Sequence, residues 1–203
     1  MRQKLKNIAD SITVGQIMSR VSYKDDESKG EFQQPVKVLV PSAISGGVIH
    51  EENLGTAVLK KEVSEERITK EGDIAIKLSS PYDCALITSD DIGYVIPSFC
   101  ALIRGVDENL LDLHYLVGYM NSSLAISDLV ASINSTSMAM VRGKSLEELE
   151  IVFPTLQEQR VAGQAYRLSC MKKQSLQRME DQQQKISDTV ILETIKEVIR
   201  HEK

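Results

Sequence analysis

The chain has 203 residues, of which 42% are hydrophobic and 26% charged, and its formal net charge is −5. These values are typical of one medium-sized domain with an appendage, and no apolar run approaches the roughly 20 residues that span a bilayer. The basic N-terminus lacks a following apolar stretch and the three cysteines form no close pair, so we expect a cytoplasmic protein without a metal site or cofactor.

Short apolar runs bounded by Gly, Pro and polar residues predict strands through most of the chain. Residues 5–14 predict a short helical turn and then a strand that ends at Gly15. The other expected strands are residues 36–40, 48–49, 56–63, 74–78, 84–88, 93–96, 98–104 and 151–153. We expect 84–88 and 93–96 to pair around residues 89–91. Glu71-Gly72-Asp73 predicts a tight turn before residues 74–78. The expected surface loops are residues 22–35, 79–83 and 134–144.

Helical periodicity first appears after residue 109. Leucines and other apolar residues recur at steps of three and four over residues 110–120, and a second set follows over 124–130. Two or three helices on one side of a strand-rich domain make the expected fold class α+β.

Residues 145–159 join two unlike parts of the chain. Leu146 and Leu149 belong to a short amphipathic segment, and Pro154 should stop the apolar strand that follows it. Thr155 and Glu158 have the spacing of a capping box. Because residues 156–203 contain no Pro and one Gly, they predict a single long helix. We therefore expect a globular domain over 1–154 and a helix over 155–203.

The C-terminal helix carries apolar residues mostly three, four or seven positions apart. About 47 helical residues reach about 70 Å, which is too long to bury on a domain of this size. We expect the stripe to pair with a second copy or another protein, and a helix folded back on its own domain is the alternative. The residues expected in this interface are Leu168, Met171, Met179, Ile186, Val190, Ile195 and Val198.

Charge and motifs limit the function classes. Residues 156–203 hold nine Lys/Arg and seven Asp/Glu, which leaves 15 against 22 in residues 1–155. A domain with this excess of acidic residues is unusual for a protein that binds nucleic acid. The chain has no phosphate-binding loop, no Gly-x-Gly-x-x-Gly, no Gly-x-Ser-x-Gly and no Asn/Asp-Pro-Pro-aromatic motif. This indicates a non-catalytic recognition or assembly module.

In this order, these features resemble the specificity (S) subunit of a type I restriction–modification system. The resemblance rests on the strand that leads to Gly15, the strand and turn of residues 36–49, Gly72-Asp73-Ile74 with Ser79-Ser80, and the block that ends at Gln159. The last block is the most specific. Family members usually carry two recognition domains and two helices, so this chain resembles a half-length form.

The resemblance implies a DNA target-recognition domain that assembles with a methyltransferase (M) subunit and, in restriction, with a nuclease (R) subunit. Two copies joined through their helices would read two half-sites in double-stranded DNA at a set spacing. Catalysis resides on other subunits of the family. From loop position and donor chemistry we expect DNA contacts from Arg20, Lys24, Lys77, Ser79, Ser80, Ser135, Ser137, Arg142 and Lys144.

Two other classes remain open. The acidic domain favours a specificity-like fragment that dimerises, or pairs with a full S subunit, without reading DNA. A stand-alone enzyme is the third class, and intrinsic nuclease or methyltransferase activity would be its signature.

Overall fold

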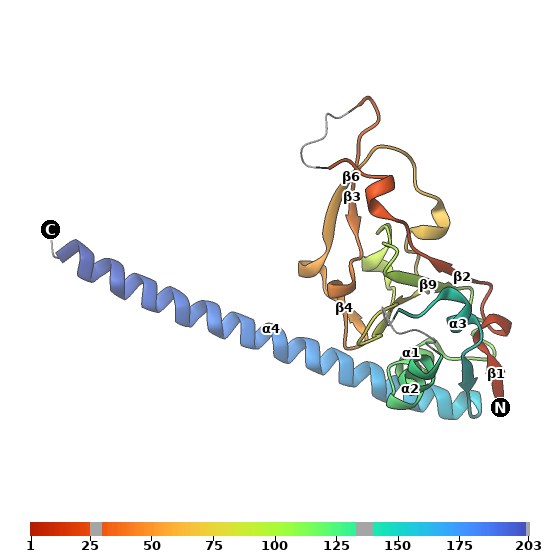
Figure 1. Ribbon diagram of the computed structural model, residues 1–203. Coiled ribbons are helices and arrows are strands. Elements are labelled where there is room, and N and C mark those ends of the chain that lie inside the picture. The colour runs from red at the N-terminus through yellow and green to blue at the C-terminus, as the bar shows by residue number, and fades with distance from the viewer. Residues whose placement is uncertain (25–29, 133–139, 202–203) are drawn as a thin grey trace. The chain divides into compact units, whose positions relative to one another are not determined.

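The computed structural model describes residues 1–24, 30–132 and 140–201 (Figure 1). The chain divides into two compact units, Met1–Arg167 and Leu168–Lys203. We call the first unit the head and the second the arm, and each is described by itself.

A four-stranded antiparallel sheet forms the centre of the head. Its strands are β2 (Ser11–Val14), β7 (Ile74–Lys77), β8 (Cys84–Leu86) and β9 (Cys100–Arg104), in the order β2-β9-β7-β8. Val14 pairs with Ala101 and Lys77 pairs with Cys100. The last residues of β2 and β7 and the first residues of β9 therefore meet at one end of the sheet.

Three smaller sheets surround this centre. The pairs are β1 (Arg2–Lys4) with β10 (Glu150–Val152), β3 (Gln34–Val38) with β6 (Gly55–Leu59), and β4 (Ile44–Ser45) with β5 (Val48–Ile49). Gly46 and Gly47 turn the β4–β5 hairpin with φ values of 59° and 84°, a conformation that favours glycine. The connecting 3-10 turns are η1 (Leu5–Asn7), η2 (Met18–Arg20), η3 (Pro41–Ala43), η4 (Glu51–Asn53), η5 (Glu65–Arg67) and η6 (Ser89–Asp91).

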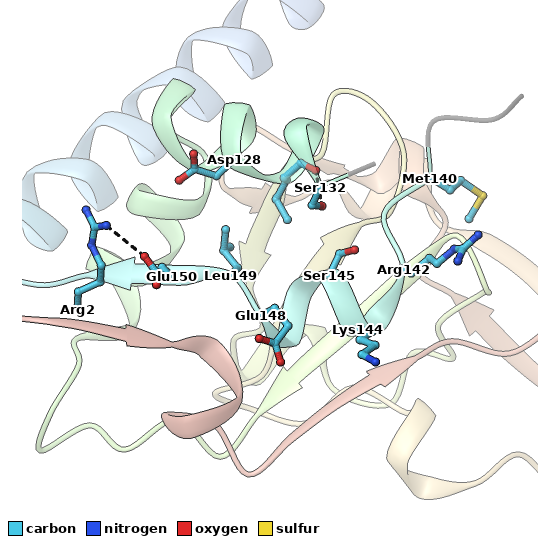
Figure 2. A pocket seen from close by; sticks show the side chains of 11 residues that line it. Arg2, Asp128, Ser132, Met140, Arg142, Lys144, Ser145, Glu148, Leu149 and Glu150 are labelled. Atoms are coloured by element: carbon cyan, nitrogen blue, oxygen red, sulfur yellow. Dashed lines mark hydrogen bonds and ion pairs between the residues drawn. The ribbon is translucent and has the colours of Figure 1, made fainter. Parts of the chain in front are cut away.

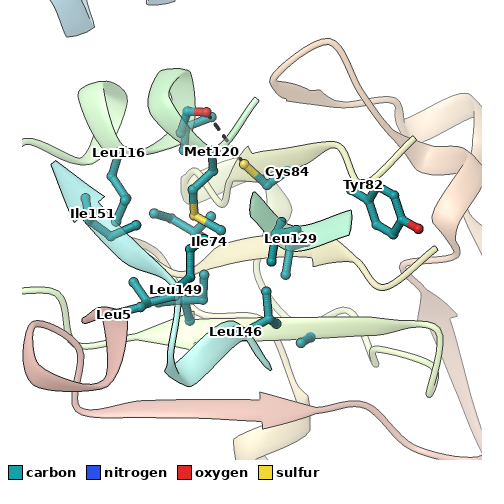
Figure 3. Packing of buried hydrophobic residues seen from close by; sticks show 14 of the residues in the cluster. Leu5, Ile74, Tyr82, Cys84, Leu116, Met120, Leu129, Leu146, Leu149 and Ile151 are labelled. Atoms are coloured by element: carbon teal, nitrogen blue, oxygen red, sulfur yellow. Dashed lines mark hydrogen bonds between the residues drawn. The ribbon is translucent and has the colours of Figure 1, made fainter. Parts of the chain in front are cut away.

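The central sheet lies between two hydrophobic cores. Ile74 and Ile76 belong to one core and Ala75 to the other, as the alternation of side chains along a strand requires. The first core is covered by α1 (Leu113–Met120), α2 (Ser123–Ala131) and α3 (Gly143–Glu147). In Figure 3, Leu116 and Met120 of α1 pack over Ile74. The α+β class expected from the sequence is confirmed.

One expected strand pair is wrong. β8 pairs with β7 and not with residues 93–96. A capping box between Thr88 and Asp91 closes η6, and Gly93 has a φ of 90°. These turns redirect the chain, so Val95 makes only single bridges, to Val38 and Ile68.

The long helix α4 (Leu156–His201) begins as the sequence predicts. Thr155 N–H and its hydroxyl both donate to Glu158 Oε2, at 2.9 and 2.7 Å, and Glu158 N–H donates back to Thr155 Oγ1 at 3.4 Å. These hydrogen bonds lower the pKa of Glu158. Although the secondary structure changes after residue 154, the compact head continues to Arg167 and includes the first turns of α4.

Gln159 and Gly163 explain why the first turns of α4 belong to the head. Gln159 is 1% exposed; its side chain accepts from Asp112 N–H at 3.0 Å and donates to the carbonyls of Leu110 and Pro154 at 3.1 and 3.0 Å. A Cβ at Gly163 would overlap the Asp112 carboxylate, so this glycine permits close packing against the start of α1.

The arm is helical throughout its described part. Leu168, Met171, Met179, Ile186, Val190 and Ile195 are exposed, together with Leu176, Ile191, Leu192 and Ile199. The side chain of Val198 lies outside the described residues. In the part of the chain that the structure describes, no helix is both long and apolar enough to cross a membrane.

Candidate nucleic-acid interface

Basic and hydroxyl side chains gather where β2 and β7 end and β9 begins. We call this surface the cationic end and define it as residues 15–20, 78–81, 97–99 and 140–144. It carries Arg20, Arg142 and Lys144, and these four segments contain no Asp or Glu. The strand order brings the first three segments together, and a bridge between Ser79 and Met140 adds the fourth.

Backbone hydrogen bonds hold these segments in place. Gly15 N–H donates to Cys100 O at 2.9 Å, and Gln16 N–H donates to Ile96 O at 2.8 Å. Val141 N–H donates to Leu78 O at 2.7 Å. A Cβ at Gly15 would overlap the carbonyl oxygen of Pro97, so only glycine permits this close approach. Gly15, the glycine after β2 on which the family resemblance partly rests, therefore allows residues 15–20 and 97–99 to pack closely together.

The opposite end of the sheet is acidic. Residues 71–73, 90–91 and 107–108 bring carboxylates to the end where β7 starts and β9 stops. Asp73 is 1% exposed and forms a two-pronged ion pair with Arg104, at 2.7 Å to Nε and 2.6 Å to Nη2. This pairing raises the pKa of Arg104. The aspartate of the Gly-Asp-Ile motif thus has a structural partner.

The two ends of the central sheet therefore differ in charge, although residues 1–155 are acidic in sum. The carboxylates of residues 71–73, 90–91 and 107–108 lie at the other end of the sheet, whereas Asp83 pairs with Lys77 and three further carboxylates line a cleft beside Arg142. A local basic surface can attract a polyanion even on an acidic domain, since charges beyond about 10 Å are screened at 0.1 M salt.

The residues predicted to contact DNA take different positions in the fold. Arg20 is exposed in η2, on the cationic end, and Lys24 is exposed four residues further on. Ser80 is exposed and Ser79 is partly buried beside Met140. Arg142 and Lys144 are exposed at the start of α3. Ser135 and Ser137 lie outside the described residues.

Lys77 differs from the other predicted cations. It is 8% exposed, and its Nζ lies 2.9 Å from Asp83 Oδ2. The ammonium therefore neutralises the carboxylate that precedes β8, and a phosphate contact would require this pair to break. Lys77 therefore stays a predicted contact whose ammonium is mostly buried and already paired.

A cleft of about 590 Å³ adjoins Arg142 and Lys144 (Figure 2). Its walls also carry Ser132, Ser145, Asp128, Arg2, Glu148 and Glu150. The carboxylates along it are partly neutralised. Arg2 pairs with Glu150 at 3.1 Å, and Lys4 and Lys6 each lie 2.5 Å from Glu148. These two lysines lower the pKa of Glu148 to about 2. The cleft is thus suited to polar contacts near the basic surface.

Sequence reasoning missed Arg67, which lies near the cationic end because its Nε donates to Val14 O at 3.3 Å. No local pattern marks it, since η5 reaches β2 only in the folded chain. Across residues 1–24, 30–132 and 140–201, no group of His, Cys, Asp and Glu could hold a metal ion. The arrangement can supply contacts to anions and hydrogen bonds.

Comparisons with known proteins identify the fold. No protein-family model matches the chain, and no curated protein is similar in sequence. One similar solved chain comes from a study of complex assembly and conformational transition of the type I R-M system. Its TM-score is 0.63 at 17% identity, over 98% of this chain and 49% of that one. The HsdS subunit from Thermoanaerobacter tengcongensis gives a TM-score of 0.61 at 16% identity, over 94% of this chain and 46% of HsdS.

The chain therefore spans about half the length of the solved chains it matches. The head, the entry into α4 and the helix itself are covered together, since the match takes in nearly the whole chain. The resemblance drawn from the sequence is confirmed at the level of structure: this chain has the fold of one half of a type I HsdS specificity subunit.

Proposed function

We propose that this protein is a non-catalytic DNA-recognition subunit of a type I-like methyltransferase complex in the cytoplasm. The head (with the first turns of α4) reads a half-site in double-stranded DNA, and the arm joins two copies at a set spacing. A methyltransferase subunit supplies the chemistry, and a nuclease subunit joins where restriction occurs. The cationic end is the observation that carries the proposal.

Its side chains suit a DNA duplex. Arg142, Lys144 and Arg20 can neutralise phosphates or meet guanine edges, while Ser79 and Ser80 can donate to or accept from bases. Lys24, Lys77, Ser135 and Ser137 remain predicted DNA contacts outside the cationic end as defined above. Paired strands hold the cationic end, which favours a positioned reading surface over a mobile one.

The arm supports the pairing of two copies. Its apolar side chains are exposed along the helix, and a stripe of this kind requires a partner in water. The residues proposed for the helix interface are Leu168, Met171, Met179, Ile186, Val190, Ile195 and Val198. A twofold pair would give a palindromic, bipartite target because both heads read the same half-site.

The deciding experiment is methylome sequencing of the host with and without the gene, together with co-purification of the methyltransferase. A bipartite methylated motif that vanishes with the gene supports the proposal. If methylation stays the same and the protein is still a dimer, the second candidate is favoured. That candidate is a regulatory fragment that pairs through its helix without reading DNA, and the acidic balance of residues 1–155 is the observation in its favour.

The proposed phosphate contacts can be tested in the assembled complex. Changing both Arg142 and Lys144 to Ala should weaken binding to the motif duplex. The slope of log affinity against log salt should also fall by about 1 for each phosphate that the variant no longer neutralises. Lys70→Ala is the matched control, because this exposed lysine lies at the acidic end and pairs with Glu65. Equal DNA affinity of the wild type, the double variant and the control would show that Arg142 and Lys144 do not contribute to DNA binding.

The helix interface has its own test. Ile186→Asp with Val190→Asp places charges on exposed apolar positions and should convert a dimer to a monomer in light scattering. Gln183→Asp, on the polar middle of the arm, is the control and should leave the mass unchanged. A constant mass in all proteins contradicts pairing through these positions.

A further inference from the structure

Two large apolar side chains project into solvent from the cationic end. Phe99 is 49% exposed and Ile17 is 41% exposed. Phe99 lies in a tight turn closed by Cys100 N–H, which donates to Pro97 O at 2.9 Å. Burial of such side chains is favourable, so their exposure among cations requires an explanation.

The backbone on both sides holds the turn of Phe99. Leu78 N–H donates to Phe99 O at 2.9 Å, which joins the turn to the end of β7. Ser98 N–H donates to Gln16 O at 2.8 Å, which joins it to the segment that carries Ile17. The segment that carries Phe99 is therefore joined on one side to the segment of Ile17 and on the other to the end of β7, before Ser79.

The charges around these two side chains indicate which partner covers them. Arg20, Arg142 and Lys144 share the cationic end, so a polyanion fits better than a neutral protein surface. In the major groove of DNA, each thymine presents an apolar C5-methyl group between two rows of phosphates. Exposed apolar side chains on a surface that also carries cations and hydroxyls suit that pattern.

We propose that Phe99, with Ile17 on the adjoining segment, is a specificity-determining residue that contacts a thymine C5-methyl group in the half-site. This proposal rests on the proposed function, since it assigns one base contact within the same surface. The basic residues would fix the position of the head on the phosphates, and the apolar pair would select the base. A protein partner on this patch is the alternative that the test must exclude.

The test combines one protein change with one DNA change. The methylome of the host gives the motif, and the purified complex is then titrated with that duplex. Each thymine in turn is replaced by uracil, which lacks only the methyl group. At one position wild-type binding should fall roughly fourfold, the effect of losing one buried methyl. With Phe99→Ala, binding should be weaker and that uracil substitution should have no further effect.

Controls separate recognition from folding and from protein binding. Ile92→Ala removes an equally exposed apolar side chain (50%) near the acidic end. It should lose as much affinity as the wild type when the thymine is replaced by uracil. Phe99→Leu retains an apolar contact and should keep part of the response. Thermal melting of each variant shows whether it is folded.

Each outcome is informative. If the wild-type gene produces no methylated motif, the proposed function fails. If the motif exists and Phe99→Ala responds to uracil as the wild type does, the base contact is refuted while the proposed function stands. If folded Phe99→Ala loses the methyltransferase during purification, the patch contacts protein and the proposal is overturned.

Discussion

Replacing Gln159 by Leu should destabilise the head by removing the hydrogen bonds that fasten the start of α4. The amide of Gln159 is 1% exposed and serves three backbone groups, the N–H of Asp112 and the carbonyls of Leu110 and Pro154. Leucine has a similar volume but can serve none of them. The change therefore leaves buried polar groups without a partner and creates little empty space.

The expected loss of unfolding free energy is about 2–4 kcal/mol. One unsatisfied buried group costs about 1–3 kcal/mol, and the apolar side chain offsets part of the sum for three groups. Gln157→Leu is the matched control, because Gln157 is exposed one half-turn earlier. An exposed substitution of this kind should stay within about 0.5 kcal/mol of the wild type.

Urea unfolding followed by tyrosine fluorescence measures this difference. The chain has no Trp, and its six tyrosines all lie before residue 168, so the signal reports the head and not the arm. The proteins should be compared at one concentration, because pairing of arms would make stability depend on it. A Gln159→Leu curve that overlays Gln157→Leu would refute the role given to this amide.

Three further changes test the packing of the head. Gly163→Ala should lower the melting temperature, because the added Cβ overlaps Asp112. In an isolated helix alanine would instead be favoured by about 1 kcal/mol, so a rise in melting temperature would contradict this packing. Gly15→Ala should lower both stability and DNA binding of the complex, since its Cβ overlaps Pro97, and unchanged values would show that the loop can move. Glu148→Gln should lower the melting temperature at pH 6. Because the folded pKa is about 2, below the ordinary 4.5, this difference should shrink as pH falls between those values; a constant difference refutes the ion-pair origin.

Local signals in the sequence were sufficient for elements whose partners are close along the chain. The capping box of Thr155 and Glu158 was predictable because both ends of its hydrogen bonds lie three residues apart. The pairing expected for residues 93–96 was wrong, because two apolar runs around a polar turn do not reveal that Gly93 takes a positive φ.

The character of the candidate site depended on contacts that only the fold creates. Lys77 was expected to be exposed because it follows the Gly-Asp-Ile turn in the sequence. The β7–β8 hairpin instead brings it beside Asp83 and buries it. The separation of cations from carboxylates depends on the strand order of the central sheet, which composition cannot show. The net charge alone therefore could not indicate that four segments without Asp or Glu meet at one end of the sheet.

The pairing of β1 with β10 has a consequence for how longer chains of this fold can be built. Arg2 lies opposite Val152, and the ammonium of Met1 donates to Phe153 O at 2.8 Å, so the polypeptide enters the head beside the place where it leaves. A sequence fused ahead of residue 1 would be delivered next to the root of α4. A segment appended there can therefore lie against the start of α4 while the β1–β10 pair stays intact.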